Sequence, residues 1–128
     1  MNRYHIKLGF EAGHISQLKE LTEQLNNRAF SYSEHCLDNL KYRFLDLKGI
    51  LFFIKGIELK AEHIFEYYEE SGKIIKLCYR ITYDNLQDII LVVTSEKKIV
   101  TIYINSVGDN HITLKKELYK NTLTKAEL

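Results

Sequence analysis

The sequence predicts an α+β domain in which two N-terminal helices pack on a twisted antiparallel sheet of about four strands. Two observations predict it: apolar residues recur at helical spacing in the first half, and apolar and polar residues alternate in the second half. The short turns between consecutive strands favour an antiparallel meander. The 128 residues suit a single domain with an N-terminal arm and helix (1–30), a core of one helix and a meander (31–120), and a tail (121–128).

The first half is expected to be helical. Residues 1–10 alternate as in a short strand or a surface arm, and residues 11–27 carry a helical stripe of Ile15, Leu18, Leu21 and Leu25. A second helix begins after Ser31 or Ser33, whose hydroxyl is a natural cap, and runs to about Lys48. We expect its buried face to consist of Leu37, Leu40, Phe44 and Leu47. Residues 50–55 are either a continuation of this helix or a separate apolar turn.

The second half is expected to form strands at residues 64–69, 74–83, 88–94 and 99–105, with turns at Ser71-Gly72, Asp84-Asn85 and 95–98. The strand at 88–94 is almost entirely apolar, as is typical of a central strand covered on both sides. Alternation separates the faces of the other long strands. In the strand at 74–83, the two faces are expected to carry Ile75, Leu77, Tyr79 and Ile81 on one side and Lys76, Cys78, Arg80 and Thr82 on the other. In the strand at 99–105, they are expected to carry Val100, Ile102 and Ile104 on one side and Thr101, Tyr103 and Asn105 on the other.

Composition excludes several classes of protein. The net charge of +1 is far below that of typical nucleic-acid-binding domains, although an enzyme that holds a few nucleotides needs less charge. The longest apolar run, 49–54, is too short to span a membrane, and residues 1–10 do not resemble a signal peptide. We therefore expect a cytoplasmic protein without membrane association. Cys36 and Cys78 lack metal-ligand spacing and are expected to be free thiols.

One stretch carries groups suited to RNA chemistry. His35, Asn39 and Arg43 follow each other at i, i+4 and i+8 of the second helix and form one polar stripe. His35 lies in the first helical turn, where the positive end of the helix dipole favours a neutral imidazole that can act as a base. Arg43 can bind a phosphate in bidentate fashion. The structural alternatives are a surface histidine near a cap and an arginine paired with Asp46 or Asp38.

The last predicted strand supplies hydroxyl groups, and the loop after it supplies a second imidazole. RNA cleavage without metal requires a base for the 2′-hydroxyl, an acid for the 5′-leaving oxygen and a cation or donor at the phosphate. We expect catalysis from His35, Arg43, Tyr103, His111 and Thr113 and substrate binding from Asn39, Arg80, Thr101, Asn105 and Lys115. No cofactor or metal is expected, because the spacing of His14, His35, His63 and His111 does not support a metal site. The alternative for the strand row is an ordinary solvated sheet face.

These residues also carry a resemblance to a known family. The order Ser-x-His-Cys-x-x-x-Leu-x-x-Arg at 33–43, then Ile-Val-Thr-Ile-Tyr at 99–103 and Asp-Asn-His-x-Thr-Leu at 109–114, resembles toxin domains of the barnase/colicin/RelE-like (BECR) ribonuclease superfamily. The similarity is greatest to phage-derived and polymorphic-toxin members. It implies helices on a twisted sheet, RNA cut in the cleft between them, and an antitoxin or immunity protein as partner. The chain departs from the family pattern where residues 44–47 separate Arg43 from Gly49-Ile50.

Two functions are therefore expected. The first is a small endoribonuclease, a toxin or mobile-element effector that cuts tRNA or other structured RNA by 2′-hydroxyl attack. The second is a noncatalytic phage or mobile-element protein that binds another protein through the same scaffold. An enzyme requires His35, Arg43 and His111 to converge around one phosphate-sized space, whereas a binding protein scatters them and exposes an apolar patch.

Overall fold

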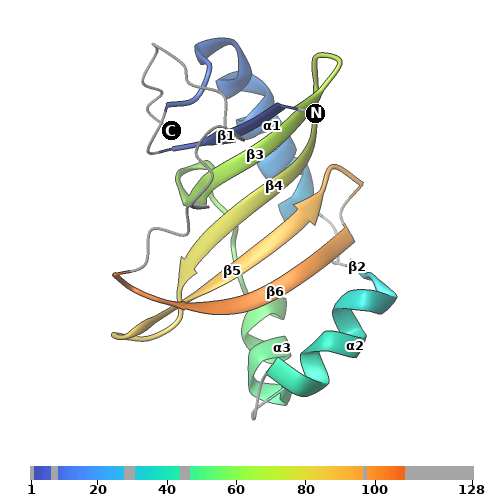
Figure 1. The fold of residues 1–128 in the computed structure, drawn as a ribbon, viewed down its shortest axis with the longest axis vertical. Coiled ribbons are helices and arrows are strands. Elements are labelled where there is room, and N and C mark those ends of the chain that lie inside the picture. The colour runs from blue at the N-terminus through green and yellow to red at the C-terminus, as the bar shows by residue number, and fades with distance from the viewer. Residues whose placement is uncertain (1, 7–8, 28–30, 44–46, 97, 109–128) are drawn as a thin grey trace.

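The computed structural model describes residues 2–6, 9–27, 31–43, 47–96 and 98–108; for residues 41–43, 47 and 105 it describes the backbone alone. The chain forms a six-stranded sheet with helices packed against it (Figure 1). The strands are β1 (Asn2–His5), β2 (Ser31–Tyr32), β3 (Ile64–Glu70), β4 (Lys73–Thr82), β5 (Gln87–Thr94) and β6 (Lys98–Ser106). The helices are α1 (Ile15–Asn26), α2 (Glu34–Arg43) and α3 (Leu47–Lys55), with 3₁₀ turns η1 (Ala12–His14) and η2 (Ala61–His63).

The sheet is built around the predicted meander. Its strand order is β1-β3-β4-β5-β6-β2, and β3 to β6 pair antiparallel with their sequence neighbours. The turn between β3 and β4 is the predicted Ser71-Gly72 pair, and both residues have positive φ (52° and 82°), as a tight hairpin turn requires. Two strands from the N-terminal third close the edges: β1 pairs antiparallel with β3, and β2 pairs parallel with β6.

The sheet therefore differs in part from the prediction. It has six strands rather than about four, and it is mixed rather than purely antiparallel, because of the β2–β6 pair. The chain also forms a third helix, α3, where the sequence left open a continuation of the second helix or an apolar turn. The α+β class and the meander are confirmed. Local patterns could not predict the edge pairs, since the residues of each pair are more than 60 positions apart.

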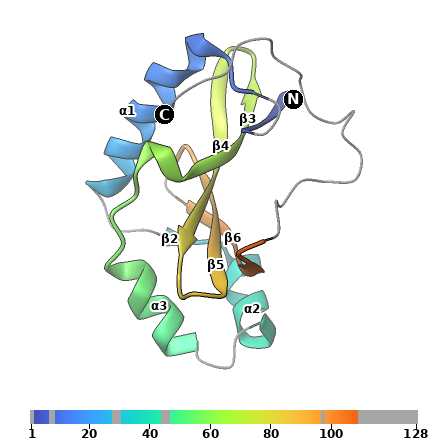
Figure 2. The ribbon, with the colours of Figure 1, turned by 90° about the vertical axis from the view of Figure 1, so that its left-hand side faces the viewer.

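One continuous core fills the space between the sheet and the helices. In Figure 2, α1 and α3 lie on the same side of the sheet, and we call the sheet face toward them the core face. Leu18 and Leu25 of α1, Cys36 and Leu40 of α2, and Ile50 and Ile54 of α3 join one buried cluster with strand residues that include Tyr67, Leu77, Tyr79, Leu91 and Ile102. Each helix is thus held mainly by its apolar face.

Caps and side-chain pins fix the helix ends. The Ser33 hydroxyl accepts a hydrogen bond from the backbone N–H of Cys36 (3.0 Å), so the predicted cap of the second helix is confirmed. At the end of α1, the Asn26 amide both donates to the Leu59 carbonyl (2.6 Å) and accepts from the Leu59 N–H (2.8 Å). Because these two bonds imitate a strand pair, they anchor the end of α1 to the segment that leads into β3.

Register irregularities change which side chains face the core. Ile74 rather than Ile75 is buried in the core, next to an irregularity at Tyr68/Glu69. At the irregularity between β5 and β6, Val92/Val93, Ile99 rather than Val100 is buried. A bulge reverses the alternation beyond it, and the sequence pattern alone does not contain one.

The buried face of the second helix also differs from the prediction. Leu40 is buried as expected, but Leu37 is 43% exposed and Cys36 occupies the core instead. Phe44 and Leu47, the other two residues predicted for this buried face, are not among the side chains that the structure describes. The helix therefore turns its small cysteine toward β6, with which it makes its main strand contact.

Candidate functional site: the polar sheet face

The sheet face opposite the core face carries three of the side chains that the sequence singled out, Arg80, Thr101 and Tyr103. We call it the polar sheet face; Figure 1 looks onto it, with α1 behind the strands. Strand register aligns its side chains in rows across the sheet. One row runs His5, Glu66, Cys78, Val92 and Thr101; a second runs Arg3, Tyr68 and Lys76; and a third runs Arg80, Ile90 and Tyr103. The predicted shared face of Thr101 and Tyr103 is confirmed, and the register places Arg80 on that face too, which the sequence left open.

A buried carboxylate organises one end of this face. The Glu66 side chain is only 2% exposed, and its Oε2 atom lies 3.1 Å from Nη2 of Arg3. The same oxygen accepts a hydrogen bond from the Tyr68 hydroxyl (3.0 Å) and a weak one from the Cys78 thiol (3.8 Å). Burial of a carboxylate is tolerable when it has partners of this kind. Glu66 therefore fixes the positions of a cation and a phenol at the surface.

Two cations lie against the Tyr68 ring. The Arg3 guanidinium carbon and the Lys76 ammonium nitrogen are each 5.1 Å from its centroid, within cation–π range. Arg3 remains 27% exposed, and Lys76 is half-buried. Among the described residues, Lys76 forms no ion pair with a carboxylate, so its charge is available to an anion. Burial, and then the Glu66 carboxylate, raise the pKa of Tyr68, so this phenol stays protonated and remains a donor.

Cys78 lies in the same cluster but is not suited to nucleophilic chemistry. Burial, and then the neighbouring Glu66, raise the pKa of its thiol. Neither Cys78 nor Cys36 forms a disulfide, as the sequence predicted, and both are buried. Phe65, Cys78 and Ile90, with Val92 and Tyr103 beside them, form the small apolar cluster of this face.

Arg80 has structural partners at the other end of the polar sheet face. Its Nε donates to Oδ2 of Asp88 (2.6 Å), and Nη2 donates to the carbonyl oxygens of Ser106 (2.8 Å) and Val107 (3.4 Å). Both charged side chains are less than one fifth exposed. Arg80 thus ties β4 to β5 and to the end of β6, whatever further role it has.

The predicted helix residues lie elsewhere. His35 is exposed on α2, and its Nε2 is 2.9 Å from the side-chain nitrogen of Asn39, one turn on. This contact confirms that the two side chains share a stripe. However, α2 packs through Cys36 and Leu40 into the core that contains Ile99 and Ile102, while Tyr103 packs in the cluster on the other face. The described contacts of His35 and Asn39 are therefore with each other, and none joins them to Thr101 or Tyr103.

The remaining predicted site residues are described in part or not at all. Arg43 ends α2, but its side chain lies outside the described side chains, as does that of Asn105, whose backbone pairs with Asp88. His111, Thr113 and Lys115 lie outside the described residues. Arg3, Glu66, Tyr68 and Lys76 were missed as site residues. Their signal, charged and aromatic residues at alternate positions of facing strands, becomes visible only when β1 is known to pair with β3.

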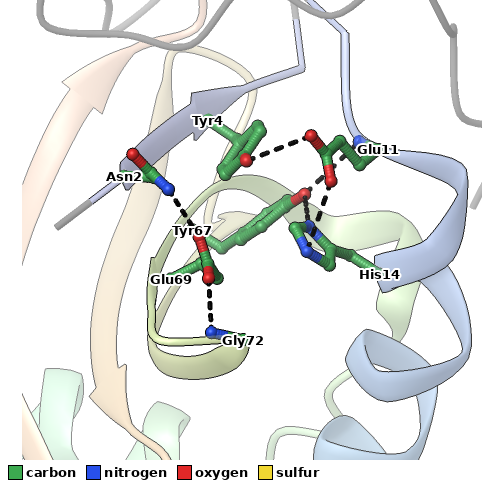
Figure 3. A network of polar contacts seen from close by, with 7 residues as sticks. All are labelled: Asn2, Tyr4, Glu11, His14, Tyr67, Glu69 and Gly72. Atoms are coloured by element: carbon green, nitrogen blue, oxygen red, sulfur yellow. Dashed lines mark hydrogen bonds and ion pairs between the residues drawn. The ribbon is translucent and has the colours of Figure 1, made fainter.

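A second polar network joins the N-terminal segment to β3 (Figure 3). The Tyr67 hydroxyl lies 2.6 Å from Nδ1 of His14 and accepts a bond from the Glu11 N–H (3.4 Å). Nε2 of His14 is 3.5 Å from the Glu11 carboxylate, which also accepts from Tyr4 (3.3 Å). Although this resembles a carboxylate–imidazole–hydroxyl relay, Tyr67 is fully buried beneath the stacked ring of Tyr4. We therefore interpret the network as an anchor rather than as a catalytic site.

The described residues include no cluster of three or more histidine, cysteine or acidic side chains able to hold a metal ion. Nor does any helix in the described ranges have both the length and the apolar character needed to cross a bilayer. Comparison of the chain with protein-family models, curated proteins and solved structures gives no match.

Proposed function

We propose that the chain is a metal-independent ribonuclease that binds RNA on the polar sheet face and cuts tRNA or other structured RNA by attack of the 2′-hydroxyl. The observation that carries the proposal is that Arg3, Lys76 and the hydroxyl-bearing residues Thr101 and Tyr103 lie on one face of the sheet, spread from β1 to β6. Cations and hydroxyl donors on one surface are the groups that bind and polarise a phosphodiester.

In this proposal Arg3 and Lys76 bind phosphate oxygens, and Glu66 and Tyr68 act as positioning residues that hold Arg3 in place. Tyr103 lies two strands from Arg80, about 10 Å at usual strand spacing, and donates a hydrogen bond to the phosphate or the leaving oxygen. The general base that takes the 2′-hydroxyl proton is still predicted to be a histidine imidazole. His111 follows β6, the strand that carries Tyr103, whereas His35 faces solvent on α2.

The experiment compares RNA binding and cleavage in EDTA for the wild type and matched variants. Lys76→Gln should weaken RNA binding and lower the slope of log affinity against log salt by about one. Lys19→Gln, at an exposed position of α1 behind the sheet, is the control and should change neither. Tyr103→Phe should slow cleavage at least about tenfold with RNA affinity retained. Intact RNA of several classes after prolonged incubation with folded protein would remove the ribonuclease proposal.

His35→Ala decides where catalysis takes place. Catalysis on the polar sheet face requires this variant to keep its activity, because His35 pairs with Asn39 away from Tyr103. Loss of cleavage with folding retained would instead restore the sequence prediction that His35 is the base, and it would exclude the polar sheet face as the whole active site.

A second candidate is the noncatalytic protein-binding module. The observations that favour it are the separation of His35 from Tyr103 and the exposure of large apolar side chains, above all Phe52 (80% exposed) and Leu86 (77%). This candidate, like an antitoxin-bound toxin, requires a protein partner. Wild-type protein that binds a partner but leaves every RNA intact in EDTA would support it over the ribonuclease.

A further inference from the structure

An apolar groove lies between α3 and the end of β4, away from the polar sheet face. It encloses about 590 Å³, and its walls include Phe52, Phe53, Ile57, Ile81, Tyr83 and Glu58. The ring of Phe53 packs edge-on against Tyr83 (centroids 5.1 Å apart) and so joins the helix wall to the strand wall. A groove of this size and lining accepts one or two apolar side chains.

The exposed side chain of Phe52 beside this groove is unusual for a protein surface that faces only water. Its side chain is 80% exposed although it lies in the middle of the most apolar helix of the described chain. Ile50 and Ile54 of the same helix are buried in the core, and Leu51 and Phe53 pack partly buried against it. Burial of one phenylalanine contributes about 1.5–3 kcal/mol, so an exposed one beside an apolar groove is a strong candidate for an interface anchor.

The charges around the groove are of both signs. Lys48 and Lys55 are exposed one turn before and one turn after Phe52, on the same side of α3. Glu58, three residues after Lys55, belongs to the lining of the groove, and Asp84 follows Tyr83 at its strand wall; both are exposed. A partner of a single charge sign would be repelled at one of the two walls. A second copy turned by a two-fold axis instead brings the basic wall of each copy to the acidic wall of the other.

We propose that this groove is the interface at which two copies of the chain associate, with Phe52 of each copy entering the groove of the other. Lysines of α3 in one copy face Glu58 of the other across the axis. The inference does not depend on RNA cleavage, because the groove shares no residue with the polar sheet face.

Sedimentation velocity over a range of protein concentrations tests the proposal directly. The wild type should dimerise, and Phe52→Asp should raise the dimer dissociation constant at least about 30-fold, as the loss of an interface anchor does. The matched control is Leu86→Asp, which alters an almost equally exposed side chain (77%) that does not line the groove and should leave the dimer intact. Circular dichroism of each variant checks that the fold is retained.

Charge reversal tests the orientation. Lys55→Glu and Glu58→Lys should each weaken the dimer, and the double variant should restore it because the exchanged charges face each other again. A wild type that is monomeric at all concentrations would overturn the proposal and leave the groove to a different partner. So would a dimer that survives Phe52→Asp, or one that Leu86→Asp dissociates equally.

Discussion

The Tyr67 hydroxyl on β3 and the His14 imidazole in η1 are 2.6 Å apart, and this contact joins the two ends of the Glu11–His14 turn to the sheet. Burial raises the pKa of Tyr67, so the phenol stays protonated and can donate to Nδ1 of His14 while it accepts from Glu11. Burial, and then the charge of Glu11, likewise raise the pKa of Tyr4 to about 12. The position of the segment between β1 and α1 thus depends on the buried hydroxyl of Tyr67.

Tyr67→Phe should therefore lower the free energy of unfolding by about 1–3 kcal/mol, because it removes two hydrogen bonds and leaves their partners unsatisfied. Urea denaturation measures the change. Tyr83→Phe, which keeps the edge-on contact with Phe53, is the control and should cost less. Equal losses in both variants would mean that the Tyr67 hydroxyl contributes nothing specific.

The β3–β4 turn depends on glycine at one position. Gly72 has a φ of +82°, which a residue with a Cβ adopts only with strain, so Gly72→Ala should destabilise the fold by about 1 kcal/mol. Thermal unfolding measures this loss. Gly13→Ala is the matched control, because a Cβ at Gly13 meets nothing within 4 Å and φ there is not positive, and it should be neutral or slightly stabilising.

Glu69 gives the fold a dependence on acidic pH. The Asn2 amide (2.8 Å) and then the Gly72 N–H (2.7 Å) lower the pKa of Glu69 below its ordinary value of 4.5. A carboxyl whose pKa is lower in the folded state stabilises the fold above its unfolded pKa, and this contribution is lost as the pH falls through the folded pKa. Glu69→Gln should thus be less stable than wild type at pH 7, with the difference shrinking below about pH 4.5.

Denaturation curves at several pH values between 7 and 3 measure that difference. Glu70→Gln, at the neighbouring exposed position, is the control. A stability difference for Glu69→Gln that stays constant over this pH range would show that its hydrogen bonds do not depend on ionisation.

The Arg80–Asp88 pair should behave as one structural unit. Arg80→Leu leaves the Asp88 carboxylate without its cation in a largely buried site and should cost about 1–3 kcal/mol. The double variant Arg80→Leu/Asp88→Leu should lose less, and the coupling energy from the double-mutant cycle reports the interaction. Additive losses would contradict this. Any RNA assay of an Arg80 variant must be accompanied by a measurement of its unfolding, because replacing Arg80 alters the stability of the fold as well as the polar sheet face.

Local patterns predicted the elements of the meander well. The strands at 64–69, 74–83, 88–94 and 99–105 correspond to β3–β6 with ends within about two residues, and Ser33 caps its helix as expected. These features depend on neighbours in sequence. The shared face of Thr101 and Tyr103 follows from the same alternation, and hence the sequence predicted part of the candidate site.

The rest depends on contacts that sequence patterns do not record. Whether His35 and Tyr103 share a cleft is decided by which side of β6 the helix α2 packs on, and Cys36 rather than Leu37 determines this. Glu66 reads as a solvated strand residue until β1 brings Arg3 beside it. Phe52 reads as a core residue in an apolar helix, although it is the side chain that the fold leaves outside.

The edge pairings of the sheet affect how the protein can fold while it is synthesised on the ribosome. Strand β1 has no partner until Glu69, which pairs with Asn2, has been synthesised. Strand β2 has none until Lys98, which pairs with Ser31, has been synthesised. The hairpins β3–β6 need only short loops and so have the lowest entropy cost of closure. A nascent chain released early therefore presents unpaired strand edges, because β1 and β2 gain their partners only when β3 and β6, more than 60 residues later, have been synthesised.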